Sequence, residues 1–188
     1  MTRTATSAIL LATLLSTVPS SPAFGDAVRE AFDSAFAGRM RRVRATADRA
    51  DDLALARDML RAADQASDQP AMVELLCENA RDLALRGDEG RSVAIRAMET
   101  LAERVPAKRL KALEEIVAIE QRLFAATPAA RREPAARRLV AALRRAGEAA
   151  AGRDAADAAA GYYRRATAIA RRTRGMDAEA LERRLDYM

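Results

Sequence analysis

Apolar residues recur at intervals of three and four along most of the chain. In the first such segment Val28, Phe32, Phe36, Met40 and Val43 fall on one face of a helix, and the later segments follow the same rule. No stretch shows the strict alternation or the enrichment in β-branched residues that is typical of a strand. The pattern therefore predicts an all-α protein of seven or eight helices.

Turn-forming residues divide this pattern into segments. Asp51 or Asp52 is expected to begin the second helix, Pro70 the third and Pro106 the fifth. Gly87 is expected to end the third helix in the left-handed conformation that glycine tolerates best. The expected buried positions include Val73, Leu76, Cys77 and Ala80; Leu110, Leu113, Val117 and Phe124; Leu139, Leu143, Ala146 and Ala150; and Ala159, Tyr163, Ala166 and Ala170.

The last third of the chain carries two further boundaries. Thr127 with Pro128, followed by Pro134, predicts an irregular joint over residues 127–134, which is the best candidate for a hinge. Asp177 is expected to cap a short final helix in which Leu181 faces inward. We treat residues 26–188 as one α-helical, repeat-like domain.

Two windows of the chain share one spacing, with offsets of 0, 7, 11 and 14: Gly87, Ala94, Met98 and Leu101, and Gly152, Ala159, Tyr163 and Ala166. A helix that ends at glycine, a polar turn, and then a small, a bulky and a small residue together resemble the second half of a tetratricopeptide repeat. The resemblance implies antiparallel helical hairpins stacked as a short array, whose concave surface binds proteins or peptides. An irregular α-helical bundle is the alternative architecture.

The N-terminal segment, residues 1–25, has a different character. Arg3 supplies a positive start, residues 8–18 an apolar stretch and residues 19–25 a tail rich in helix breakers, which is the pattern of a secretory signal peptide. Eleven residues span about 16 Å as a helix, roughly half of the hydrocarbon core of a bilayer. We therefore predict cleavage between Gly25 and Asp26, export to a periplasm or to the cell exterior, and no transmembrane segment in the mature chain.

The composition narrows the chemistry that the chain offers. There is no histidine, which removes the usual general base near neutral pH and the helical His-Glu-x-x-His zinc site. The single cysteine, Cys77, excludes an internal disulfide and is expected to be buried. Glu114, Glu115 and Glu120 form an acidic cluster, but adjacent residues of a helix point about 100° apart. We expect no catalytic residue, no cofactor, no metal ion and no enzymatic activity.

Charge is divided between two parts of the chain. Residues 45–120 carry 11 basic and 16 acidic groups, a net charge of −5, whereas residues 121–174 carry 13 basic and 4 acidic groups, a net charge of +9. Opposite charges of this kind permit head-to-tail self-association. Only Lys108 and Lys111 are lysines among the 32 basic residues, so part of the arginine content reflects a compositional bias.

Paired arginines in the basic part are the candidate contact surface. Intervals of seven residues, close to two helical turns, place four arginines on one face of each of two helices: Arg137, Arg138, Arg144 and Arg145, and Arg164, Arg165, Arg171 and Arg172. Guanidinium groups suit carboxylate or phosphate partners, so an unknown protein or an acidic polymer is expected to bind there. Nucleic acid is an unlikely partner, because export removes the chain from it and interleaved aromatic residues are missing.

These observations give two hypotheses of function. The first is an exported helical scaffold that mediates protein–protein interaction through the eight arginines. The alternative is a structural or self-assembling helical bundle with an anion-binding basic face, in which the arginines serve mainly for solvation.

Overall fold

The computed structural model describes residues 22–187, and within them every regular element is helical. The described residues form eight α-helices, which confirms the predicted fold class: α1 Pro22–Ala45, α2 Arg49–Gln65, α3 Pro70–Ala84, α4 Arg91–Arg104, α5 Arg109–Ala126, α6 Arg132–Ala151, α7 Ala156–Ala170 and α8 Ala178–Asp186. Three short 3₁₀ turns join them: η1 Asp88–Gly90, η2 Pro106–Lys108 and η3 Ala129–Arg131. Most of the predicted signal peptide lies outside the described residues.

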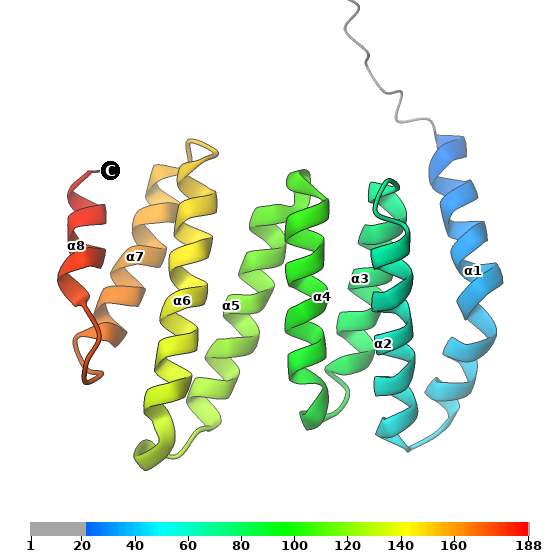
Figure 1. Cartoon of the computed structure of the whole chain (residues 1–188), viewed down its shortest axis with the longest axis horizontal. Coiled ribbons are helices and arrows are strands. Elements are labelled where there is room, and N and C mark those ends of the chain that lie inside the picture. The colour runs from blue at the N-terminus through cyan, green and yellow to red at the C-terminus, as the bar shows by residue number, and fades with distance from the viewer. Residues whose placement is uncertain (1–21, 188) are drawn as a thin grey trace, which may run out of the picture.

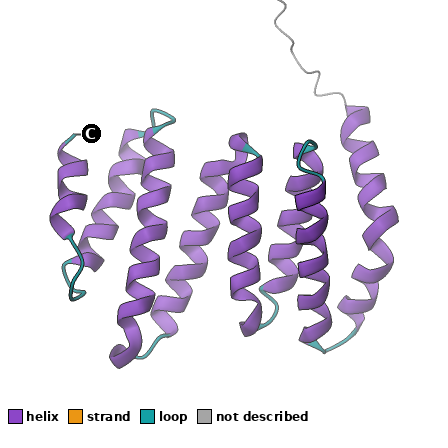
Figure 2. Ribbon diagram, in the orientation of Figure 1, coloured by secondary structure: helices purple, strands orange, loops and turns teal. Residues whose placement is uncertain are grey.

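Successive helices are antiparallel and pack against their neighbours in the sequence. Each helix contacts the next one, and α1 also contacts α3 while α2 contacts α4. Figure 1 shows α2, α4 and α6 in one row, with α3, α5 and α7 in a second row behind it. Figure 2 shows that only short loops connect the helices. The predicted stacking of antiparallel hairpins is therefore confirmed, with α1 and α8 at the two ends. None of the described helices is both long and apolar enough to span a bilayer.

The helices of the first row begin at nearly equal intervals along the chain. Helices α2, α4 and α6 begin at Arg49, Arg91 and Arg132. Matching positions of this row are buried, namely Ala56, Met98 and Leu139; Met59, Leu101 and Ala142; and Ala63, Val105 and Ala146. Burial of the side chains therefore repeats along this row, whereas the residue types do not. For this reason the repeat is not visible in the sequence.

In each of the two windows that suggested a repeat, the glycine precedes a helix and the other three residues lie in that helix, which is α4 for the first window and α7 for the second. These helices are three elements apart and belong to different rows, whereas equivalent positions of a two-helix repeat are always an even number of helices apart. The windows are therefore not equivalent positions. In the second window α7 packs closely on α6, where a Cβ added at Gly147 would lie 2.9 Å from Cε2 of Tyr163.

The start of α2 differs from the prediction. Its N-cap is Asp48, whose carboxylate accepts a hydrogen bond of 2.9 Å from the backbone N–H of Ala50. Asp52 lies one turn further and is only 1 % exposed. Its two carboxylate oxygens accept hydrogen bonds from Arg86 at 2.6 Å and Arg49 at 3.2 Å. Asp52 therefore joins α2 to the segment that follows α3 and does not begin the helix.

The prediction for Gly87 was also wrong. Gly87 is extended, with φ −129° and ψ 153°, and the left-handed residues in the described range are Asp154 and Gly175, with φ of 57° and 69°. The sterically required glycine of this turn is Gly90, where an added Cβ would lie 1.9 Å from the carbonyl oxygen of Ala84. Close approach of two backbone segments, and not a left-handed helix end, accounts for glycine here.

The joint predicted over residues 127–134 is shorter in the structure. Helix α6 already begins at Arg132, and Pro134 lies in its first turn, where a missing backbone N–H costs no hydrogen bond. Asp177 caps α8 as predicted, because its carboxylate accepts a hydrogen bond of 3.0 Å from the N–H of Ala180. Leu181 of the same helix is buried, also as predicted. The role of the joint as a hinge stays a prediction.

Two glycines provide a matched test of this packing. We expect Gly90→Ala to lower the free energy of unfolding by about 3 kcal/mol, because the carbonyl of Ala84 leaves no space for a methyl group. Gly161, within α7, has no heavy atom within 4 Å of an added Cβ, so Gly161→Ala should raise the free energy of unfolding by about 0.5–1 kcal/mol. Urea unfolding measures both values. A Gly90→Ala protein as stable as the wild type would contradict the close approach.

Cys77 makes the fold sensitive to alkaline pH. The residue is fully buried, as predicted, and burial, with smaller contributions from the Asp64 and Glu78 carboxylates, raises the pKa of its thiol from 9.0 to about 12. The folded chain keeps a proton that the unfolded chain releases above pH 9, so stability falls as the pH rises from about 9 toward about 12.

Urea unfolding at pH 9 and at pH 10.5 measures this effect. We expect the wild type to lose about 2 kcal/mol more than Cys77→Ala over this interval. Because the tyrosines titrate in both proteins, their contribution to the pH dependence of stability cancels in this comparison. Equal losses in the two proteins would show that the thiol ionises in the folded state.

Candidate functional site

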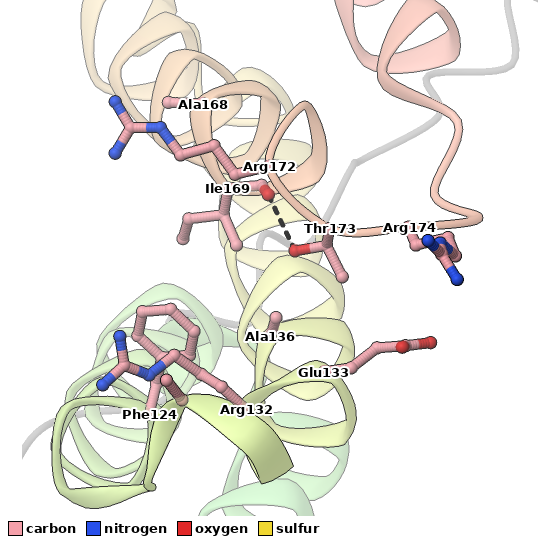
Figure 3. Close-up of a pocket in the computed structure, with 10 residues that line it drawn as sticks. Phe124, Arg132, Glu133, Ala136, Ala168, Ile169, Arg172, Thr173 and Arg174 are labelled. Atoms are coloured by element: carbon pink, nitrogen blue, oxygen red, sulfur yellow. Dashed lines mark hydrogen bonds between the residues drawn. The ribbon is translucent and has the colours of Figure 1, made fainter.

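A cavity of about 520 Å³ lies between the end of α5, the start of α6 and the end of α7. We call it the first cavity. Phe124 and Ile169 supply much of its apolar lining, and Arg132, Arg172 and Arg174 supply its positive charge. Figure 3 shows these side chains around the space between the helices.

One wall is formed by the reversal of the chain from α5 into α6. Phe124 lies in the last turn of α5, and Arg132 is the first residue of α6. The guanidinium carbon of Arg132 stands 5.3 Å from the centre of the Phe124 ring, and its Nε donates a hydrogen bond of 3.1 Å to the carbonyl of Thr127. Phe124 was predicted as a core residue, but it is only half-buried and lines the cavity.

The end of α7 and the loop after it form the opposite wall. Thr173 closes this end by donating a hydrogen bond of 2.9 Å to the carbonyl of Ile169, drawn as a dashed line in Figure 3. Figure 3 also shows the guanidinium groups of Arg132 and Arg172 on the same side of the cavity, each from its own wall, while Arg174 and Glu133 lie on the other side. The two walls thus present arginines toward one opening.

The charge of the first cavity is not neutralised locally. In the part of the chain that the structure describes, no carboxylate forms an ion pair with Arg132, Arg172 or Arg174. The one acidic residue in the lining, Glu133, pairs with Arg137 at 2.8 Å. Exposed guanidinium groups beside an apolar surface suit a ligand that carries both a carboxylate or phosphate and an apolar group.

The four candidate arginines of α6 diverge to two sides of the helix. Arg138 pairs with the buried Glu120 of α5 at 3.2 Å, and Arg145 pairs with Glu99 of α4 at 2.9 Å. Arg137 and Arg144 instead line a second cavity, between α6 and α8. The first two therefore hold the array together, whereas the second two border open space.

The four candidate arginines of α7 are also separated by their contacts. Arg165 donates a hydrogen bond of 2.7 Å to the side chain of Gln121, and Arg171 pairs with Glu182 of α8 at 2.8 Å. Arg164 is exposed, and Arg172 lines the first cavity. Arg172 is thus the one candidate that the structure brings to this cavity. The binding role of the eight residues stays a prediction.

The acidic cluster of α5 is dispersed over different partners. Glu114 accepts a hydrogen bond of 2.7 Å from the hydroxyl of Tyr162, Glu115 lies 3.6 Å from Arg81, and Glu120 pairs with Arg138. Burial and the hydrogen bond to Glu114 raise the pKa of Tyr162 to about 12. These carboxylates therefore link α5 to three neighbouring helices.

Sequence reasoning missed Phe124, Arg132 and Arg174 as site residues. The sequence does contain a signal for one wall, because an aromatic residue and an arginine flank the turn that contains Pro128. The other wall had no such signal, since only the fold shows that the end of α7 lies opposite Phe124.

Comparison with known proteins adds no relative. No protein-family model matches this chain, and no curated protein or solved structure is significantly similar to it. Conclusions about function therefore rest on the residues themselves.

The effect of a substitution on the free energy of unfolding should distinguish arginines that form ion pairs from arginines that line the first cavity. We expect Arg138→Gln to lower the free energy of unfolding by about 2 kcal/mol, because it leaves the buried Glu120 carboxylate without its partner. Arg172→Gln should change it by less than about 0.5 kcal/mol. The double variant Glu120→Gln with Arg138→Gln should recover most of the loss. Equal effects of the two single variants in urea unfolding would contradict this division.

Proposed function

We propose that this chain is an exported helical scaffold that binds an acidic segment of a partner protein at the first cavity. The observation that carries the proposal is the placement of Arg132 and Arg172 on opposite walls, beside an apolar lining, without carboxylate partners in the described chain. Carboxylates of a partner would pair with these arginines, and an apolar side chain would contact Phe124 and Ile169.

The open architecture supports a scaffold. Stacked helical hairpins bury their core between neighbouring units and leave extended surfaces that bind proteins or peptides. Tetratricopeptide-like arrays work in this way, although the interval between the starts of α2, α4 and α6 is longer than the length of that repeat. The proposal includes export through the predicted signal peptide, and it includes no catalytic activity.

The shape of the first cavity favours a protein partner over a nucleic acid. Its volume of about 520 Å³ accommodates a few side chains. Phe124 is the single aromatic residue of its lining, so successive bases have no platform on which to stack. Salt-sensitive pairing between guanidinium groups and carboxylates is the expected mode of binding.

Affinity capture from the exported fractions of the source organism tests this function. We expect the wild type to retain an acidic partner that is released by moderate salt, and we expect Arg132→Gln with Arg172→Gln to retain less than about a tenth of it. Arg57→Gln with Arg104→Gln is the matched control, because it removes two exposed charges from α2 and α4.

Two outcomes would count against the proposal. Retention of the same proteins by the cavity variant and the wild type would show that the first cavity binds none of them. Recovery of the native chain only in the cytoplasm, with residues 1–25 attached, would show that it is not exported.

A further inference from the structure

A second basic cavity lies beside the first, on the other side of the loop between α7 and α8. Its volume is about 480 Å³, and we call it the second cavity. Arg137, Arg144 and Arg184 supply its positive charge, while Val140, Met176 and Leu181 supply apolar lining. It therefore has the same combination of guanidinium groups and apolar surface as the first cavity.

Only a thin partition separates the two cavities. Residues 172–174 line the first cavity and residues 176–177 line the second, so the partition is the loop at Gly175. Arg137 holds this loop by donating hydrogen bonds of 3.0 Å and 3.4 Å to the carbonyls of Arg174 and Gly175. It also donates to Glu133, at 2.8 Å, which lines the first cavity. Arg137 thus lines the second cavity and contacts two residues that line the first.

The backbone of the partition is adapted to this contact. Gly175 has a positive φ of 69°, and a Cβ added there would lie 3.3 Å from Nη2 of Arg137. Glycine therefore lets the loop turn sharply and pass close to the guanidinium group. The partition consists of backbone and one side chain, and residues of α6 line both cavities.

The combined charge of the two cavities is positive. Six arginines line them, whereas the acidic lining residues are three: Glu133, Glu148 and Asp177. Glu133 and Glu148 pair with Arg137 and Arg144, at 2.8 Å and 3.7 Å. Asp177 accepts the capping hydrogen bond of α8. An occupant of this surface must therefore supply carboxylates or other anions of its own.

We propose that the two cavities act as one groove, interrupted by the loop at Gly175, and bind an extended acidic peptide of about seven residues that crosses this loop, with an apolar side chain near each end. This inference rests on the proposed function and specifies the ligand. The groove follows α6 from Glu133 to Glu148, about 22 Å of helix, and an extended chain covers that distance with about seven residues.

The order of the lining groups distinguishes a peptide from a lipid. Apolar lining lies in both cavities, on either side of the partition at Arg137. A lipid has its charge at one end and its apolar chains at the other, whereas a peptide places acidic residues between two apolar ones. The arrangement of this groove matches the peptide.

Selection from a random peptide library, followed by fluorescence anisotropy with the enriched peptide, tests the inference on the full chain. We expect enrichment of acidic peptides with two apolar residues about six positions apart. Binding should weaken at least tenfold in each of two double variants. The first-cavity variant is Arg132→Gln with Arg172→Gln, and the second-cavity variant is Arg144→Gln with Arg184→Gln. The control, Arg57→Gln with Arg104→Gln, should weaken it less than about threefold. Thermal melting verifies that each variant is folded.

The outcomes distinguish this inference from the proposed function. Weakening by the first-cavity variant alone would overturn the two-cavity groove and leave the proposed function in place. Weakening by neither variant, or enrichment of peptides without acidic residues, would overturn both. Binding to vesicles of phosphatidylglycerol without binding to any enriched peptide would assign the surface to a membrane and would also overturn both.

Discussion

Close approach between helices that are neighbours in the sequence holds this array together and positions its cavities. Small residues make this approach possible: an added Cβ would strike the Ala84 carbonyl at Gly90 and the Tyr163 ring at Gly147. Because each helix buries its apolar face mainly against adjacent helices, the array stays open at its ends. Both α5 and α7 pack on α6, and the space between their ends is the first cavity.

The abundance of arginine has two separate explanations in this architecture. Arginines that face a neighbouring hairpin are neutralised there, as Arg138 is by Glu120 and Arg145 by Glu99. Both lysines have the same role, since Lys108 and Lys111 pair with Glu74 and Glu78 of α3. Arg132, Arg172 and Arg174 have no such partner in the described residues, and all three line one cavity. An arginine that pairs with another helix contributes to the array, whereas one without such a partner beside an apolar surface is available to a ligand.

Local rules predicted most of the fold and little of the site. Helical periodicity and the signals at Pro70 and Asp177 depend on residues close in sequence, so helix number, most of the core and the final cap followed from them. Asp52 was misassigned because its partner Arg86 comes from beyond the next helix. Phe124 was taken for a core residue because periodicity shows which face is apolar, but not whether another helix covers it. The eight arginines were likewise grouped by the helix face on which they lie, because periodicity does not show which residues of other helices they contact. Their ion-pair and hydrogen-bond partners lie on different helices.

The arginine Nε–Hε signals of the ¹⁵N-labelled chain distinguish arginines that pair with another helix from those that line the first cavity. During titration with hexaglutamate, the signals of Arg132 and Arg172 should shift together and saturate at one ligand concentration. Those of Arg138 and Arg145 should stay in place, because Glu120 and Glu99 already occupy these side chains. Uniform shifts of all arginines, or shifts confined to residues away from the first cavity, would show that the first cavity is not a specific anion site.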